Sequence, residues 1–304
     1  MIRKMIRRNL WGLYLINQYH VIYSKINEKL FSDIEVINKW YKKHAGCLPN
    51  LENPKKFSEK QQWYKLNDRK PLQEKCADKY EVREYIKSCG YGSLLNEIYG
   101  IYEKVEDIDI DKLPKQVVLK ATHGSGFNLI VKDKDNVNWK MWKRIMKSWL
   151  NQDIYWSGRE WVYKNLKRRI VVEKYLEDET GELRDYKFFC FNGEPRFMQL
   201  EVGRFGKNKT RNFYDMEWKL MPFGKELPHN PDLHVEKPYA FEEMKRIAKE
   251  LSKPFTFVRV DLYQVGGKVY FGELTFFPAG GAPDFVPKEY DEVVGNMWNI
   301  YEKR

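Results

Sequence analysis

Apolar and polar residues alternate most regularly near the C-terminus, in segments 257–263 and 269–275 on either side of Gly266-Gly267. A period of two around a glycine turn predicts a β-hairpin. If the loop has three residues, Asp261 of the first strand lies directly opposite Glu273 of the second. A two-residue loop would put the two carboxylates on opposite faces, because a one-residue slip reverses every side chain of a strand.

Elsewhere the pattern predicts helices and strands in the order of an α+β fold. Residues 1 to about 50 are expected to be helical, ending at Gly46, and Ser58 with Gln61 has the spacing of a capping box for the next helix. Asn192-Gly193 predicts a further hairpin, so we expect antiparallel sheets. Other helices are predicted at about 78–88, 139–150, 241–251 and the C-terminus, and strands at 117–120, 129–132, 170–176, 186–191 and 196–202.

Length and composition set broad limits on this chain. Its 304 residues and hydrophobic content of 42% allow a sizeable core, in two lobes or in one domain with a small subdomain. No stretch approaches the ~20 apolar residues of a membrane span. The four cysteines lack metal-ligand spacing, so we expect reduced thiols in a cytoplasmic protein. The net charge of +11 suits an anionic partner or a solvated cationic surface, but Lys and Arg are spread along the chain, which argues against nucleic-acid binding.

The first eleven residues combine apolar positions at helical spacing with four basic residues, Arg3, Lys4, Arg7 and Arg8. Two interpretations follow. The segment is either a capping helix that packs on the main body, or a peripheral contact with the anionic inner surface of a membrane. A secretory signal is disfavoured because no small-residue cleavage site follows.

The predicted hairpin is the first candidate for chemistry. Asp261 and Glu273 are two carboxylates beside Arg259 on otherwise apolar strands, and burying them without a partner is costly. Mg²⁺ carrying phosphates is a suitable partner, since it binds carboxylate and phosphate oxygens. A structural Arg–Asp–Glu ion network is the alternative.

The glycine-containing segment 122–128 is the second candidate. Its glycines let backbone N–H groups approach an anion, Ser125 adds a hydroxyl, and the ammonium of Lys120 can reach the same phosphates. The segment joins two strands and opens no helix, so it is neither a P-loop nor a dinucleotide-binding turn. His123 is either a substrate contact or a polar surface residue.

Several short segments carry a family resemblance. In chain order they are Asp78–Arg83, Val118–Lys120, His123–Gly126, Val172–Leu176, Asp185–Phe189, Arg259-x-Asp261 and Gly272–Thr275. This order resembles the ATP-grasp enzymes, and within them the TupA-like (teichuronopeptide-biosynthesis) branch, over about residues 50–290. The resemblance implies two α+β lobes that grip a nucleotide, with an N-terminal helical extension. The implied segments are an extension 1–50, an N-terminal lobe 51–112, a small subdomain with the glycine flap 113–176, and a C-terminal subdomain with the metal site 177–304.

The resemblance also implies roles for individual residues. Lys79 and Lys120 would contact the ATP phosphates, and Asp185 would approach the ribose. Lys187 would face the phosphate or the substrate carboxylate, and Arg259 would stabilise charge on the transferring group. The flap residues that would cover the phosphates are His123, Gly124, Ser125 and Gly126; the hinge strand at the adenine would comprise Glu173, Lys174, Tyr175 and Leu176; the Mg²⁺ ligands would be Asp261, Glu273 and Thr275. Many ATP-grasp enzymes place an asparagine where this chain has Thr275, which leaves a second metal site open.

The activity implied by the resemblance is ATP-dependent ligation of a carboxylate to an amine through an acyl phosphate. The branch suggests that an amino acid or peptide is joined to a uronic-acid carboxyl in cell-surface polysaccharide biosynthesis. The aromatic and basic stretch 155–161, Arg168-Arg169, Arg204 and Arg211 would suit an anionic saccharide, or the stretch is a packed surface connection. The alternatives are a kinase that uses the same ATP site, and a glycosyltransferase. A glycosyltransferase would usually keep an Asp-x-Asp pair near the switch point of a parallel sheet, and the sequence shows no pair in such a place.

Overall fold

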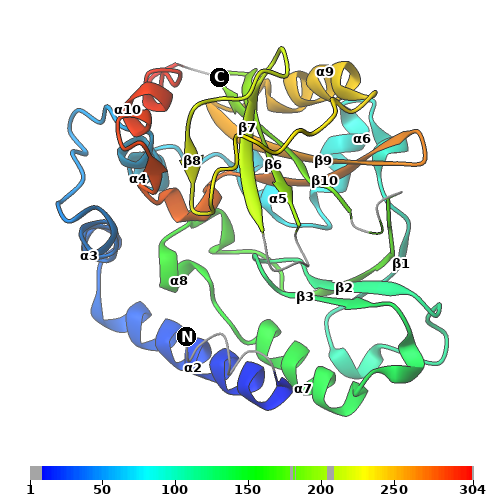
Figure 1. The fold of residues 1–304 in the computed structure, drawn as a ribbon. Helices are drawn as coiled ribbons and strands as arrows, with labels where there is room; N and C mark the ends of the chain where they lie inside the picture. The colour runs from blue at the N-terminus through cyan, green and yellow to red at the C-terminus, as the bar shows by residue number, and fades with distance from the viewer. Residues whose placement is uncertain (1–8, 179–180, 182, 204–208, 303–304) are drawn as a thin grey trace. The chain divides into compact units, whose positions relative to one another are not determined.

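The computed structural model describes residues 9–178, 181, 183–203 and 209–302. The chain forms two compact units (Figure 1), of which unit 1 comprises residues 1–36, 74–82 and 96–175, and unit 2 comprises residues 37–73, 83–95 and 176–304. Residues 1–8, which carry the basic part of the expected membrane contact, lie outside the described residues, as does Arg204. None of the described helices is both long and apolar enough to cross a bilayer.

Unit 1 is built on a four-stranded antiparallel sheet in the order β1-β4-β2-β3. Its strands are β1 (Ile98–Tyr102), β2 (Val117–Ala121), β3 (Asn128–Val131) and β4 (Ile170–Lys174), and its main helices are α2 (Leu10–Leu30), α7 (Trp139–Leu150) and α8 (Tyr155–Gly158). Apolar side chains from the sheet and from α7 form one buried cluster. The three predicted strands are present. The edge strand β1 was not predicted, because its residues are all half-buried and show no alternation.

Unit 2 is built on a five-stranded antiparallel sheet in the order β10-β9-β5-β6-β7. These strands are β5 (Tyr186–Phe191), β6 (Glu194–Val202), β7 (Thr210–Asp215), β9 (Phe257–Val265) and β10 (Lys268–Thr275), and α9 (Phe241–Ser252) packs on the sheet. The core is largely aromatic, with Phe57 of α4 (Phe57–Asn67) in ring contact with Phe189, Phe257 and Trp298. The expected α+β class and antiparallel sheets are therefore confirmed.

The remaining elements belong to neither of these two sheets. They are α3 (Asp33–Ala45), α5 (Pro71–Ala77), α6 (Val82–Ser88), α10 (Tyr290–Gly295), β8 (Gly224–Lys225), β11 (Phe285–Val286) and the 3₁₀ turns η1 (Gly92–Leu94), η2 (Val105–Asp107), η3 (Lys134–Asn136), η4 (Trp161–Tyr163) and η5 (Pro278–Gly281). The predicted end of the N-terminal helices at Gly46 is confirmed by its positive φ of 78°.

The predicted capping box at Ser58 is wrong. Helix α4 begins two residues earlier than this cap would place it, at Phe57, and the carboxylate of Glu59 accepts hydrogen bonds from the backbone N–H groups of Lys55 and Lys56, both at 3.2 Å. Ser58 lies inside the helix, where its hydroxyl donates to Asp291 at 2.5 Å. The neighbouring glutamate therefore caps the helix, and the serine makes a buried tertiary contact instead.

The hairpin β9–β10 joins its strands by a two-residue turn, because Val265 pairs with Lys268. The sequence left both loop lengths open, and the two-residue turn is the one that forms. The expectation that this turn would put the two carboxylates on opposite faces is wrong, because Asp261 pairs with Glu273. A β-bulge at Gly272 adds one unpaired residue to β10, and this shifts the register so that Glu273, and not Gly272, lies opposite Asp261. A Cβ at Gly272 would lie 2.9 Å from the backbone oxygen of Asp261, so only glycine fits this bulge without displacing backbone.

We predict that Gly272→Ala destabilises the protein by about 1–3 kcal/mol, the range for forcing atoms into a packed site. The free energy of unfolding would be measured by urea denaturation. Gly92→Ala is the matched control, because a Cβ there meets only the Cγ of Lys87, at 3.4 Å. Equal stability of the two variants would contradict the structural need for glycine in the bulge.

Candidate functional site

The candidate site in unit 2 is a row of charged side chains across three adjacent strands. Lys187 of β5 pairs with Asp261 of β9, and Asp261 pairs with Glu273 of β10. Arg259 lies two residues before Asp261 and pairs with Thr275. Alternation along each strand directs these side chains to the same face of the sheet, which is how distant parts of the sequence meet.

Asp261 is the centre of this row. Its side chain is 1% exposed and accepts hydrogen bonds from Lys187 Nζ at 2.7 Å, Arg259 Nε at 2.7 Å and Arg259 Nη2 at 2.6 Å. Burial raises the pKa of Asp261, and the two cations oppose that rise. Burial likewise lowers the pKa of Lys187, but Asp261 and Asp185 outweigh it, so this pKa lies above its ordinary value. The cations and the carboxylate hold each other in the charged state.

The other oxygens of the row lie on the more open side. Arg259 Nη2 is 3.0 Å from Thr275 Oγ1 and 3.4 Å from Glu273 Oε1, and Thr275 Oγ1 lies 3.1 Å from Glu273 Oε1. The Glu273 side chain is 35% exposed. Asp185 is 3.4 Å from Lys187, so three carboxylates face two cations. Glu273 is therefore the most accessible of the three carboxylates in this row.

These contacts show the Arg–Asp–Glu ion network that the sequence left open as an alternative. Within the described residues, no group of three or more His, Cys, Asp or Glu side chains is arranged to hold a metal. The oxygens of Glu273, Asp261 and Thr275 are nevertheless the donor type that Mg²⁺ takes, and Mg²⁺ completes its shell with phosphate and water oxygens. The residues therefore fit the metal chemically, and their role as ligands stays a prediction.

The glycine loop of unit 1 connects β2 to β3 and lies against Lys79. Lys79 Nζ donates to the backbone oxygen of Gly124 at 2.5 Å, and the Lys79 backbone N–H donates to Thr122 at 3.1 Å. Gly126 has a φ of 79°, which favours glycine. The structure thus brings Lys79 together with the predicted flap residues Gly124, Ser125 and Gly126.

Asp78 holds Lys79 in this place, a role that the sequence reading did not assign. Its buried carboxylate accepts from the backbone N–H groups of Tyr80 at 2.7 Å and Glu81 at 2.9 Å. Arg169 of unit 1 bridges Asp78 at 3.3 Å and Glu81 at 2.7 Å. The signal was present in the sequence, because an aspartate followed by a turn commonly accepts from the backbone two and three residues on.

Lys120 and Glu173 form an ion pair at 2.7 Å on the adjacent strands β2 and β4. Lys174 ends β4 and lies 3.8 Å from Glu97, while the ring of Tyr175 lies under Lys132 Nζ at 5.6 Å. Leu176 is the first residue of the last segment of unit 2. Of the predicted hinge strand, Glu173 is therefore the member that is joined to a predicted phosphate-binding lysine.

His123 lies beneath the glycine loop and not on the surface. Its side chain is buried, Nε2 is 3.1 Å from the backbone oxygen of Trp149, and the ring lies beside Phe127. Burial lowers the pKa of His123 to about 4. The imidazole is therefore neutral near pH 7 and supports the loop from below.

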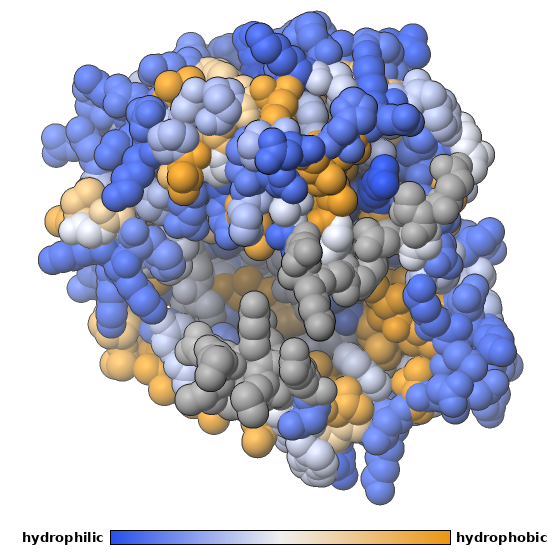
Figure 2. Space-filling model, viewed as in Figure 1, coloured by the Kyte–Doolittle hydropathy of each residue, from blue (hydrophilic) through white to orange (hydrophobic). Residues whose placement is uncertain are grey.

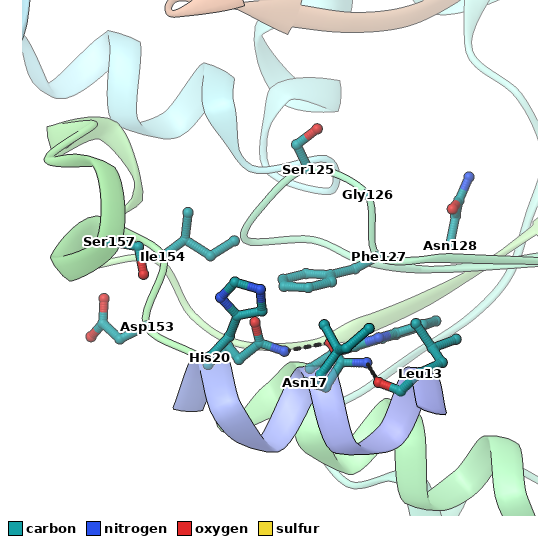
Figure 3. Close-up of a pocket in the computed structure, with 13 residues that line it drawn as sticks. Leu13, Asn17, His20, Ser125, Gly126, Phe127, Asn128, Asp153, Ile154 and Ser157 are labelled. Carbon is teal, nitrogen blue, oxygen red and sulfur yellow. Dashed lines mark hydrogen bonds between the residues drawn. The ribbon is translucent and has the colours of Figure 1, made fainter. Parts of the chain in front are cut away.

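A cavity of about 350 Å³ lies beside the glycine loop within unit 1 (Figure 3). It is bounded by α2, the loop and the connection from α7 to α8. Amide, hydroxyl, imidazole and carboxylate groups line it together with aromatic rings: Asn17, His20, Ser125, Phe127, Asn128, Trp149, Gln152, Asp153 and Ser157. The lining is mostly apolar, with Leu13, Ile16 and Ile154 beside the rings, and its polar groups include no Lys or Arg side chain.

The aromatic and basic stretch is a packed connection. Arg159 is fully buried and donates to the backbone oxygens of Asn27 at 3.0 Å and Phe31 at 2.7 Å, while Tyr155 donates to Asp33 at 2.6 Å. Arg168 pairs with Asp153 at 2.8 Å. In unit 2, Arg211 is paired with Glu201 and Glu226. These arginines have internal partners, so binding of an anionic saccharide by them stays a prediction without structural support.

Comparison with known proteins gives a family and a fold. Residues 59–299 match the family described as TupA-like ATPgrasp. No curated protein gave a significant match. Similar solved structures include D-alanine–D-alanine ligase from Bacillus anthracis, with 18% identity, 73% of this chain and 64% of that chain covered, and a TM-score of 0.43. The same enzyme complexed with ATP is 17% identical, with 72% of this chain and 61% of that chain covered and a TM-score of 0.42. Phosphoribosylamine–glycine ligase from Thermotoga maritima is 16% identical, with 69% of this chain and 51% of that chain covered and a TM-score of 0.39. The chain thus spans less than two thirds of each of these structures.

The buried His123 predicts a pH dependence of stability. Its folded-state pKa of about 4 lies below the ordinary value of 6.5, so its contribution is complete above pH 6.5 and is lost as the pH falls toward 4. A difference of this size corresponds to ~3 kcal/mol. We expect His123→Gln to lose less stability than the wild type between pH 6.5 and pH 4, measured by urea denaturation. Parallel pH profiles would contradict a buried neutral imidazole.

Proposed function

Because the chain belongs to the TupA-like ATP-grasp family, as its sequence predicts, we propose that it is an ATP-dependent carboxylate–amine ligase that works through an acyl phosphate. The observation that carries this proposal is the cluster on β5, β9 and β10, where Asp261 and Glu273 face each other beside Lys187 and Arg259. Such a cluster can neutralise and orient transferring phosphate, and the proposed reaction requires no nucleophilic side chain.

The proposed reaction has two steps. A carboxylate oxygen of the acceptor attacks the γ-phosphorus of ATP, and ADP leaves with the electrons of the broken P–O bond. The amine nitrogen then attacks the acyl carbon, the C–O bond to phosphate breaks, and the nitrogen loses a proton to solvent. Lys79 and Lys120 of unit 1 would neutralise phosphate oxygens, and the loop N–H groups would orient them. Arg259 and Lys187 of unit 2 would stabilise charge on the transferring group.

Mg²⁺ would be held by Asp261 and Glu273, with Thr275 as a ligand or as the anchor of a ligating water, and it would neutralise the phosphates of bound ATP. Arg259 orients Asp261 by a hydrogen bond of 2.7 Å, and Glu273, the more exposed of the two carboxylates, would be the more accessible ligand for the metal. We place the reaction in the cytoplasm, where ATP is available.

For the substrates, we propose an amino acid or peptide as the amine and a uronic-acid carboxyl of a cell-surface polysaccharide precursor as the acceptor. The cavity beside the glycine loop supports a hydroxyl-rich acceptor, because amide and carboxylate groups hydrogen-bond hydroxyls and the rings of Phe127 and Trp149 stack at 5.8 Å beside it. This assignment rests on the family and on the lining of the cavity.

The test of the ligase proposal is a hydroxylamine trap. Uronic acids would be incubated with ATP, Mg²⁺ and the enzyme, with hydroxylamine in place of the amine. Attack on an acyl phosphate gives a hydroxamate, which is detected by its ferric complex, together with ADP. A stable phosphorylated acceptor that ignores both hydroxylamine and amines would instead identify a kinase. If no uronic acid supports ATP turnover but other carboxylates do, the ligase proposal stands and only the proposed class of acceptor is wrong.

We predict that Glu273→Gln abolishes ATP turnover, because it removes the accessible carboxylate of the proposed metal site without changing its shape. Circular dichroism and the free energy of unfolding should remain close to those of the wild type. Glu250→Gln on the exposed side of α9 is the matched control and should turn over ATP normally. Normal turnover by Glu273→Gln would disprove the metal assignment.

We also predict that ATP binding requires Mg²⁺ and that Lys120→Ala weakens it by about tenfold or more, the effect of a lost charge-assisted contact of roughly 1.5–3 kcal/mol. Isothermal titration calorimetry with and without Mg²⁺ measures both effects. Lys115→Ala is the control on the same segment of unit 1, since that side chain is 70% exposed. Unchanged affinity in Lys120→Ala would remove Lys120 from the phosphate site.

A further inference from the structure

Helix α2 exposes a continuous apolar stripe. At 100° per residue its large exposed side chains fall within about 120° of the helix circumference. Their exposed fractions run from 39% for Tyr23 to 65% for Leu30, and the set comprises Trp11, Leu15, Tyr19, Ile22, Tyr23, Ile26 and Leu30. Figure 2 shows hydrophobic atoms along the lower left margin, where α2 lies in Figure 1.

The opposite face of α2 is polar where it is buried. Asn17, Ser24 and Asn27 are 6%, 1% and 5% exposed. Gln152 donates to Asn17 at 2.8 Å, and the buried Arg159 donates to the backbone oxygen of Asn27 at 3.0 Å. The helix is therefore inverted relative to an ordinary surface helix, which buries its apolar stripe.

These polar contacts determine which way the helix faces. Turning α2 to bury its stripe would strip Asn17 of its partner and leave the Arg159 guanidinium buried without the Asn27 oxygen, and unpaired buried polar groups are costly. Only the first turns, through Leu10, Leu13 and Tyr14, also pack on the apolar cluster of unit 1. The stripe is thus held outward by the rest of unit 1, and outward apolar stripes of this length are typical of binding surfaces.

We propose that α2 lies flat on an anionic membrane surface, with the apolar stripe inserted at the level of the headgroups. The eight residues before it contain four basic residues and no acidic one, and the exposed Lys25 and Lys29 lie at the edge of the stripe. Trp11, Tyr19 and Tyr23 are the amphipathic rings that prefer the interface. The helix has 21 residues, about 30 Å, yet it does not qualify as a span, so it lies on the bilayer and does not cross it.

A second copy of the chain is the competing occupant of the stripe, and the geometry disfavours it. A two-stranded coiled coil uses a narrow seam of two positions in seven, usually Leu, Ile or Val. The stripe of α2 is wider and includes one tryptophan and two tyrosines. The strongly basic segment that precedes it would also be repelled by its counterpart in a parallel pair.

The test is flotation of the full-length protein with lipid vesicles, which needs no knowledge of the reaction and does not rest on the proposed function. We expect binding to vesicles of phosphatidylcholine with phosphatidylglycerol, weaker binding to phosphatidylcholine alone, and a further decrease in high salt. Ile22→Glu/Ile26→Glu should reduce the partition coefficient by at least about tenfold, since two buried apolar side chains are lost from the lipid contact.

The matched control is Leu48→Glu/Val293→Glu, which also replaces two exposed apolar residues, at 59% and 44% exposure, by glutamate outside α2. It should bind vesicles like the wild type, and circular dichroism should show both double variants folded. Failure of the folded wild type to float, or equal flotation of the two double variants, overturns the proposal. A wild-type dimer that the α2 variant converts to a monomer, without vesicle binding, would assign the stripe to a second copy instead.

Discussion

The burial of Asp261 between Lys187 and Arg259 constrains unit 2 more than any other single interaction. A carboxylate that is 1% exposed is tolerated only with cations at hydrogen-bond distance, and these come from β5 and from β9 itself. The strands must therefore keep one register, and the bulge at Gly272 brings Glu273 into the same row. If one strand slipped by one residue, Asp261 would be separated from its cations. The positions of the charged side chains and the register of the strands therefore depend on each other.

Unit 1 uses the same principle around its glycine loop. Asp78 is buried, accepts backbone N–H groups and is paired with Arg169, and this places Lys79 against Gly124. His123 fills the space under the loop as a neutral ring. The loop is thus short of bulky side chains on its outside and supported on its inside, which is the arrangement that lets backbone N–H groups meet an anion.

Helix α2 differs from an ordinary surface helix, since polar residues lie on its buried face and large apolar residues lie on its exposed face. The internal partners of Arg159 and Asn17 explain this inversion. They also explain why Arg159, within the aromatic and basic stretch after α7, is packed inside unit 1. The same arginine that looked available in the sequence holds the helix in place.

The sequence by itself determined the element types, the antiparallel hairpins and the family, because alternation, the Asn192-Gly193 turn and the ordered motifs are local patterns. It also indicated that Asp261 can face Glu273, but it tied that pairing to a three-residue loop, whereas the turn has two residues. Only the tertiary structure decided the bulge at Gly272, the burial of His123, the capping of α4 by Glu59 and the inverted facing of α2. The bulge, the burial of His123 and the facing of α2 share a physical reason, since each depends on which distant backbone or side chain occupies the neighbouring space, and no local period records that. The cap of α4 is local, but Ser58 is engaged by the distant Asp291, which the local pattern does not record either.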